Sequence, residues 1–147
     1  MIVNNVDVVE ILLVEDNPGD QRLTVEALRE GKIKNNLNIV SDGESAIKYL
    51  KKEGKFSEVV KPDLILLDLN LPKKDGREVL SIIKSDINLK RIPVVILTTS
   101  NADKDVIDSY NLNVNCYITK PVDFDQFTNI VKQIGQFWFE IVRLPNE

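Results

Sequence analysis

The chain has 147 residues, of which 43% are hydrophobic and 29% charged, and its formal net charge is −4. This composition is typical of one soluble globular domain, and the sequence offers no basic face for nucleic acid, no bilayer-spanning apolar run and no signal-peptide pattern in residues 1–10. Cys116 is the only cysteine and histidine is absent, which excludes intrachain disulfides, Ser-His hydrolase chemistry and His-ligated zinc, and favours a cytoplasmic location.

Five short apolar runs alternate with helical patterns along the chain. The runs predicted as strands are residues 11–14, 37–40, 64–67, 93–97 and 116–118. Helices are predicted from apolar positions at helical spacing, which are Leu23, Ala27 and Leu28 after Pro18, then Ala46, Ile47 and Leu50, then Val79, Leu80, Ile82 and Ile83 after Gly76. A shorter polar helix is expected over residues 103–110, and Asp123 is expected to cap the last helix. Residues 31–36 and 51–61 are interpreted as surface loops.

This strict alternation predicts a parallel sheet with helices on both faces. Because crossover connections are right-handed, the expected fold is an α/β, doubly wound five-stranded sandwich. We expect residues 1–9 to be an N-terminal extension, and residues 10–147 to form a single domain with no output domain. Ligands of such sheets bind outside the carboxyl ends of the strands, so the residues at those ends are the candidates for function.

Acidic, hydroxyl and basic residues follow four of the predicted strands. Glu15 and Asp16 follow the first strand, Asp68 the third, Thr98 the fourth and Lys120 the fifth. Taken alone, Glu15 and Asp16 are better explained as acids at the positive end of the next helix. Once Asp68 is placed at a neighbouring strand end, three carboxylates without histidine predict a site for a hard cation such as Mg²⁺.

A carboxylate in the position of Asp68 is able to attack phosphorus and form an aspartyl phosphate. Phosphoryl transfer mainly requires positioning and neutralisation of the equatorial oxygens. Mg²⁺, Lys120 and the Thr98 hydroxyl supply one partner for each of these oxygens. Each residue alone has an ordinary explanation, as a loop aspartate, a surface lysine or a strand-ending threonine. Their combination indicates a phosphorylation site.

These residues resemble the receiver domains of response regulators, over nearly the whole chain. The motifs that carry the resemblance are Leu13-Val14-Glu15-Asp16-Asn17, Leu66-Leu67-Asp68-Leu69-Asn70-Leu71-Pro72 with Asp75-Gly76, Leu97-Thr98-Thr99-Ser100 and Tyr117-Ile118-Thr119-Lys120-Pro121. The resemblance implies a flavodoxin-like (βα)5 three-layer sandwich of the chemotaxis type. It also implies a stand-alone response regulator of a two-component phosphorelay, which signals through a protein contact and is not a metabolic enzyme.

The resemblance implies how the phosphoryl group and the cation are held. Asp68 is expected to accept the phosphoryl group from a phosphohistidine of a sensor histidine kinase. Glu15, Asp16, Asp68 and the backbone carbonyl of Asn70 are expected to bind Mg²⁺, with Mn²⁺ or Ca²⁺ as possible substitutes.

It further implies a set of switch residues. Thr98, Thr99 and Lys120 are expected around the phosphoryl group, Tyr117 is expected to rotate inward behind it, and Pro121 is expected to be a cis proline. Thr99 departs from the small alanine that many receivers carry. We hypothesise that its bulk slows access of the phosphoryl donor or of water.

Several features are similar to those of small, single-domain regulators paired with phytochrome-like kinases. They are Asn17-Pro18-Gly19-Asp20, Leu97-Thr98-Thr99-Ser100, and the tail from Phe137-Trp138-Phe139 through Leu144-Pro145. This similarity implies a phytochrome-like kinase as the partner.

The last helix carries more apolar side chains than one face needs. A continuous stripe comprises Phe124, Phe127, Val131, Ile134, Trp138 and Ile141. Ile130, Phe137 and Phe139 lie off this stripe, which favours a homodimer or docking surface made by the fourth helix, the fifth strand and the last helix. The alternative is that the tail folds back over the edge of its own sheet. A downstream protein target is expected in either case.

Three other functions compete with this interpretation. An aspartyl-phosphate phosphohydrolase would carry a second acid two residues after the nucleophile, where this chain has Asn70. A pseudo-receiver, which binds partners without phosphorylation, would lack an acid, the threonine or the lysine, and all of these are present. A nucleotide-binding fold would carry a glycine-rich loop after Val14, and none follows it.

Overall fold

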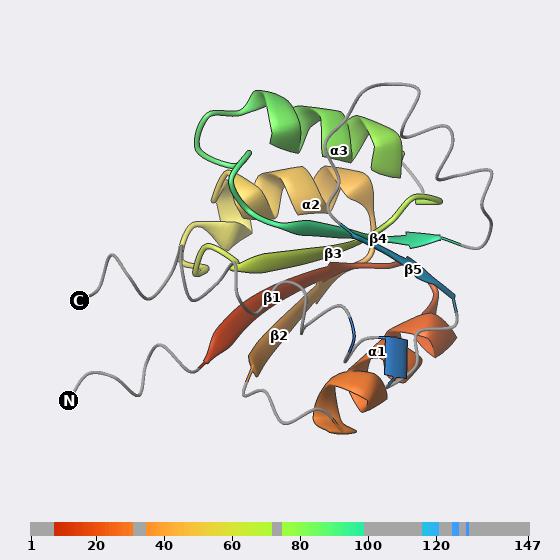
Figure 1. The fold of residues 1–147 in the computed structure, drawn as a ribbon. Coiled ribbons are helices and arrows are strands. Elements are labelled where there is room, and N and C mark those ends of the chain that lie inside the picture. Colours follow the sequence, from red (N-terminus) through yellow and green to blue (C-terminus); the bar gives the residue numbers. More distant parts are fainter. Residues whose placement is uncertain are drawn as a thin grey trace.

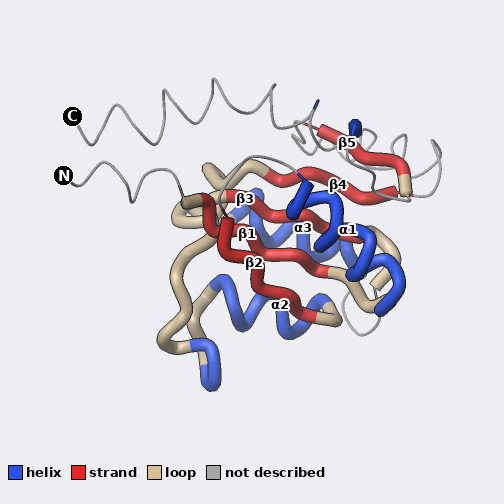
Figure 2. Tube along the Cα trace, turned by 90° about the horizontal axis from the view of Figure 1, so that it is seen from below, coloured by secondary structure: helices blue, strands red, loops and turns tan. Residues whose placement is uncertain are grey.

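Five parallel strands form one sheet in a computed structural model, which describes residues 8–30, 35–71, 75–98, 116–120, 125–126 and 129. The strands are β1 (Val9–Val14), β2 (Asn35–Val40), β3 (Leu64–Asp68), β4 (Val94–Thr98) and β5 (Cys116–Thr119). Their order across the sheet is β2-β1-β3-β4-β5 (Figure 2). This confirms the predicted α/β fold with a doubly wound parallel sheet.

The sheet is covered on both faces by helices. The helices are α1 (Pro18–Glu30), α2 (Gly43–Leu50) and α3 (Gly76–Ser85), with a short 3-10 turn, η2 (Gly54–Phe56). Figure 1 shows α1 on one face of the sheet and α2 with α3 on the other. All five residues of β3 are buried, as expected for a strand that has helices on both sides, and four of them are hydrophobic; the fifth is Asp68.

Alternate residues of the central strands belong to two separate apolar cores, one on each face of the sheet. Leu12, Ile65 and Leu67 belong to the core that includes residues of α2 and α3. Leu13 and Leu66 belong to the core on the α1 side. Burial of both faces makes the register between strands specific, because a slip by one residue exchanges the two sets of side chains.

The register brings the ends of β1 and β3 side by side. Val14 pairs with Leu67, so Glu15 follows β1 next to the position of Asp68 at the end of β3. Strand order reverses at this point, since β1 lies between β2 and β3. A parallel sheet offers its ligand crevice at such a switch point.

Side-chain caps begin two of the helices. The Asp42 carboxylate accepts a hydrogen bond from the backbone N–H of Ser45 (2.7 Å) at the start of α2. The Asp75 carboxylate accepts one from the backbone N–H of Arg77 (2.7 Å) at the start of α3. Each bond satisfies an amide that has no partner within its own helix.

Three details differ from the sequence predictions. Strand β2 begins at Asn35, inside the segment 31–36 predicted as a loop, because its backbone pairs with β1 from Val9 onward. The predicted loop 51–61 contains the η2 turn. On α1, Leu23 is 40% exposed while Thr24 is fully buried, so the polar residue occupies a core position.

Some predicted features cannot be compared with the structure. The helix over 103–110 and almost all of the last helix, with its aromatic residues, lie outside the described residues. Among the residues that are described, no helix combines the length and apolar character needed to cross a membrane.

Candidate functional site

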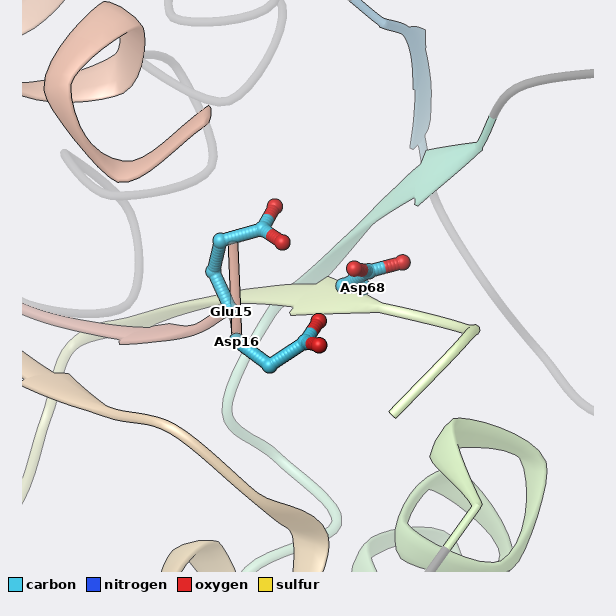
Figure 3. Close-up of side chains that lie close together, drawn as sticks. All are labelled: Glu15, Asp16 and Asp68. Carbon is cyan, nitrogen blue, oxygen red and sulfur yellow. The ribbon is translucent and has the colours of Figure 1, made fainter. Parts of the chain in front are cut away.

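Three carboxylates gather at the carboxyl ends of β1 and β3 (Figure 3). Oxygen atoms of Glu15, Asp16 and Asp68 all lie within 4.8 Å of one another. The Glu15 and Asp68 side chains are buried, and Asp16 is exposed. The convergence that strand ends alone predicted is thus present in the structure, with one side of the cluster open to water.

The three carboxylates of this cluster lie close enough to repel one another when ionised. Burial, followed by contact with Asp68, raises the pKa of Glu15 to about 7, although the nearby Lys120 lowers it. The cluster offers only oxygen ligands, and one of its acids, Asp16, is exposed to water. Such a site suits a hard divalent cation, which would reduce the repulsion between the carboxylates. The residues present therefore fit a divalent cation site.

Lys120 supplies the positive charge on the other side of the cluster. Its ammonium nitrogen lies 2.8 Å from Glu15 Oε1, 2.9 Å from Asp68 Oδ2 and 3.1 Å from Asp20 Oδ2. Burial by itself lowers the pKa of Lys120, but contacts with Glu15, Asp68 and Asp20 outweigh it and raise the pKa. Lys120 is therefore a charged ammonium held by three carboxylates.

Backbone groups fix the orientation of the two buried acids. Asp68 Oδ1 accepts a hydrogen bond from the backbone N–H of Asn70 (3.0 Å), and Oδ2 accepts one from Lys120. Glu15 Oε2 accepts one from the backbone N–H of Asn17 (3.3 Å). The Glu15 carbonyl oxygen accepts another from the side-chain amide of Gln21 (2.6 Å). Both carboxylates are thereby preorganised before any ligand binds.

The start of α3 packs tightly against the segment that follows Asp68. The backbone N–H of Gly76 donates to the Leu69 carbonyl oxygen at 3.0 Å. A Cβ atom at Gly76 would meet the Asp68 carbonyl oxygen and would lie 2.6 Å from Leu69 Cα. Only glycine lets the helix approach this closely, so Gly76 helps to set the position of the Asp68 segment.

The remaining predicted residues are placed to different extents. Thr98 ends β4, where its backbone pairs with Thr119, but its side chain lies outside the described residues. Thr99 and Pro121 also lie outside them. Tyr117 is half-buried in β5 and packs against the core on the α2–α3 side. Asn70 is exposed next to Asp68.

Sequence reasoning did not assign a role to Asp20. Its carboxylate reaches Lys120 although the two residues are separated by 100 positions in the chain. In the sequence Asp20 reads as one more acid in the first turn of a helix. The signal that was available is its distance from Glu15, which places it in the first turn of α1 at the same end of the sheet.

Comparison with known proteins agrees with this fold. A family model described as "Response regulator receiver domain" matches residues 11–132. The chain therefore belongs to the response regulator receiver family, whose members are signalling proteins of two-component systems rather than metabolic enzymes. The phosphohydrolase and pseudo-receiver alternatives are not favoured.

Within this family, several of the similar proteins are named as phytochrome or bacteriophytochrome response regulators. Response regulator Rcp1 of Synechocystis sp. is 52% identical over 92% of this chain and 92% of its own. The phosphorylated cyanobacterial phytochrome response regulator RcpA is 54% identical, over 89% and 94% of the two chains, with a TM-score of 0.74. Bacteriophytochrome response regulator RtBRR is 47% identical, over 89% and 80%, with a TM-score of 0.83. The solved structure of Rcp1 in its Mn²⁺-bound form has 51% identity over 91% and 96%, with a TM-score of 0.74.

Proposed function

We propose that this protein accepts a phosphoryl group on Asp68 from a sensor histidine kinase, with Mg²⁺ as its cation. The observation that carries the proposal is the buried Asp68 carboxylate, which belongs to the acidic cluster with Glu15 and Asp16 and also contacts the Lys120 ammonium. That combination matches the needs of an aspartate that attacks phosphorus.

The transfer needs one bond to form and one to break. An oxygen of Asp68 attacks the phosphorus of a phosphohistidine, and the bond between phosphorus and the imidazole nitrogen breaks, with its electron pair left on that nitrogen. Bound Mg²⁺ supplies positive charge to the phosphoryl oxygens. The Asn70 N–H and Lys120 hold the Asp68 carboxylate in place, and Lys120 then offers its ammonium to a phosphoryl oxygen.

The other predicted residues complete this proposal. The backbone carbonyl of Asn70 is proposed as a cation ligand together with Glu15, Asp16 and Asp68. Mn²⁺ or Ca²⁺ is proposed to substitute for Mg²⁺, and the Mn²⁺-bound form of the similar protein Rcp1 supports the former.

We further propose a switch that responds to the new phosphoryl group. Thr98 and Thr99 contact it, Tyr117 rotates inward behind it, and Pro121 is the cis proline after Lys120. The position of Thr98 at the end of β4, next to the end of β3, supports the first of these roles.

The names of the similar proteins suggest the partner. Because the similar proteins RcpA and RtBRR are named as phytochrome and bacteriophytochrome response regulators, we propose a phytochrome-like kinase as the phosphoryl donor. The match over 92% of Rcp1 supports a stand-alone regulator in which residues 10–147 act as a single receiver domain after an extension of residues 1–9. Cytoplasmic location, a downstream protein target, and a homodimer through the fourth helix, β5 and the last helix are proposed on the sequence alone.

A small phosphodonor tests the proposal without knowledge of the kinase. The purified protein is incubated with labelled acetyl phosphate in Mg²⁺ and, separately, in excess chelator. We expect acid-stable, base-labile label in Mg²⁺ only, and none in Asp68→Asn. Equal labelling of Asp68→Asn overturns the assignment, and catalytic turnover of a phosphorylated metabolite favours the phosphohydrolase.

A further inference from the structure

Among the described contacts of the Lys120 ammonium, Asp20 belongs neither to the acidic cluster nor to the phosphoacceptor. Lys120 Nζ lies 3.1 Å from Asp20 Oδ2, against 2.8 Å from Glu15 Oε1 and 2.9 Å from Asp68 Oδ2. Glu15 and Asp68 are members of the candidate cation site, and Asp20 is not. These three contacts of Lys120 are therefore not equivalent.

The acids shared by Lys120 and the cation set up a competition. A divalent cation takes its ligand oxygens from Glu15 and Asp68, which are the same side chains that hold the ammonium. Two positive charges next to the same oxygens repel each other. A bound cation would therefore weaken the contact of the ammonium with these acids, whereas Asp20 is outside the cation site and would keep its contact.

Asp20 is well placed for this task. Its backbone N–H donates to Asn17 Oδ1 (2.9 Å), and its carbonyl oxygen accepts from the hydroxyl of Thr24 (3.0 Å), which is fully buried. Hydrogen bonds before and after Asp20 thus hold the first turn of α1 in place. The Lys120 side chain is only 11% exposed, so its ammonium has little freedom to find another partner.

We infer that Asp20 is a positioning residue, which shares the Lys120 ammonium with Glu15 and Asp68 and so leaves the oxygens of these two acids more available to the cation. This inference rests on the proposed function of the site. Without Asp20, the ammonium has only Glu15 and Asp68 within reach among the acids it now contacts. It then competes fully with the cation for their oxygens, and the affinity for the cation falls.

Titration of the full-length protein with Mn²⁺ alone measures this effect directly, with free Mn²⁺ followed by electron paramagnetic resonance. We expect Asp20→Asn to weaken Mn²⁺ binding about three- to fivefold, the upper part of the range of an exposed charged pair. Glu26→Gln is the matched control, because it removes one charge from an exposed position of the same helix. Its affinity is expected to stay within about twofold of the unmodified protein.

A double-mutant cycle separates positioning from simple loss of a nearby charge. If Asp20 acts through Lys120, Asp20→Asn weakens Mn²⁺ binding at least about threefold more in the Lys120 protein than in a Lys120→Gln background. Equal losses in both backgrounds overturn the inference, because a general electrostatic or structural role needs no lysine. Unchanged affinity of Asp20→Asn overturns it as well.

Asp20→Glu guards against a folding artefact, since it keeps the charge and lengthens the side chain by one methylene. We expect Asp20→Glu to recover most of the Mn²⁺ affinity. An affinity no higher than that of Asp20→Asn counts against the inference. The proposed function is tested separately by labelling of Asp68. If Asp68 is not labelled but the cycle is non-additive, the phosphoacceptor assignment fails and the role of Asp20 in cation binding holds. If Asp68 is labelled but the cycle is additive, only the role inferred for Asp20 fails.

Discussion

Replacement of Gly76 by alanine tests whether the close approach of α3 to the end of β3 sets the site. A Cβ atom at this position would lie 2.6 Å from Leu69 Cα and 2.8 Å from the Leu69 carbonyl oxygen. Ordinary contact between carbon atoms is about 3.5–4.0 Å, so the shortfall at Leu69 Cα is about 1 Å. The obstacles are backbone atoms rather than flexible side-chain ends, and either α3 or the Asp68 segment must move.

The cost follows from that movement. Overpacking costs about 1–3 kcal/mol when side chains are able to adjust, and here the backbone must shift. A shift of α3 also loosens Val79, Leu80 and Ile83, which are fully buried in the adjoining core. We expect a loss of about 3 kcal/mol, or about 6–12 °C in the melting temperature of a chain of this size.

Urea unfolding gives the free energy, and Mn²⁺ titration of the same samples reports on the site. Gly54→Ala is the control, because Gly54 has a φ of +58° but a Cβ atom added there would have no neighbour within 4 Å, so only backbone strain of about 1 kcal/mol is expected. We expect Gly76→Ala to lose stability and Mn²⁺ affinity together, and Gly54→Ala to keep its affinity. A loss below about 1 kcal/mol at Gly76 refutes the steric argument.

Three further changes test other parts of the account. Burial raises the pKa of Asp63 above 3.8, the backbone N–H of Glu10 opposes this, and the Glu10 carboxylate adds to it. The stability contributed by Asp63 is complete below pH 3.8 and is lost as pH rises through the raised pKa. Urea unfolding should therefore show Asp63→Asn gaining on the unmodified protein as pH rises above about 4, and a constant difference contradicts this. Leu66→Ala, at a fully buried position, should cost about 2–5 kcal/mol and Leu23→Ala, at a 40% exposed one, less than about 1; equal costs would contradict the observed burial. Thr99→Ala should speed loss of the phosphoryl label, and an unchanged rate would end the hypothesis about its bulk.

The sheet could be predicted from sequence because its signals are local. The runs at 11–14 and 64–67 are apolar without interruption, which is the pattern of strands buried on both faces. The alternation of strands and helices, and the right-handed crossovers between strands, then limit the topology. Glu15, Asp16 and Asp68 come together because they lie at the ends of neighbouring strands. The general position of the site follows from those steps without any side-chain coordinates.

The remainder depends on contacts between distant segments. The start of β2 at Asn35 comes from pairing with Val9, and no local pattern marks it. The burial of Thr24 in place of Leu23 depends on how α1 is rotated about its axis against the sheet. The apolar stripe in the sequence does not define this rotation to better than one residue position. Asp20 meets Lys120 only after the whole sheet has formed.

Site mapping of the phosphorylated protein tests the central claim most directly. The protein is treated with acetyl phosphate and Mg²⁺, the acyl phosphate is reduced with borohydride, and the digested peptides are analysed by mass spectrometry. We predict that the aspartate reduced to homoserine is Asp68, and that its yield falls to background in excess chelator. Reduction at another residue, or at Asp68 to the same extent without a cation, would contradict the account.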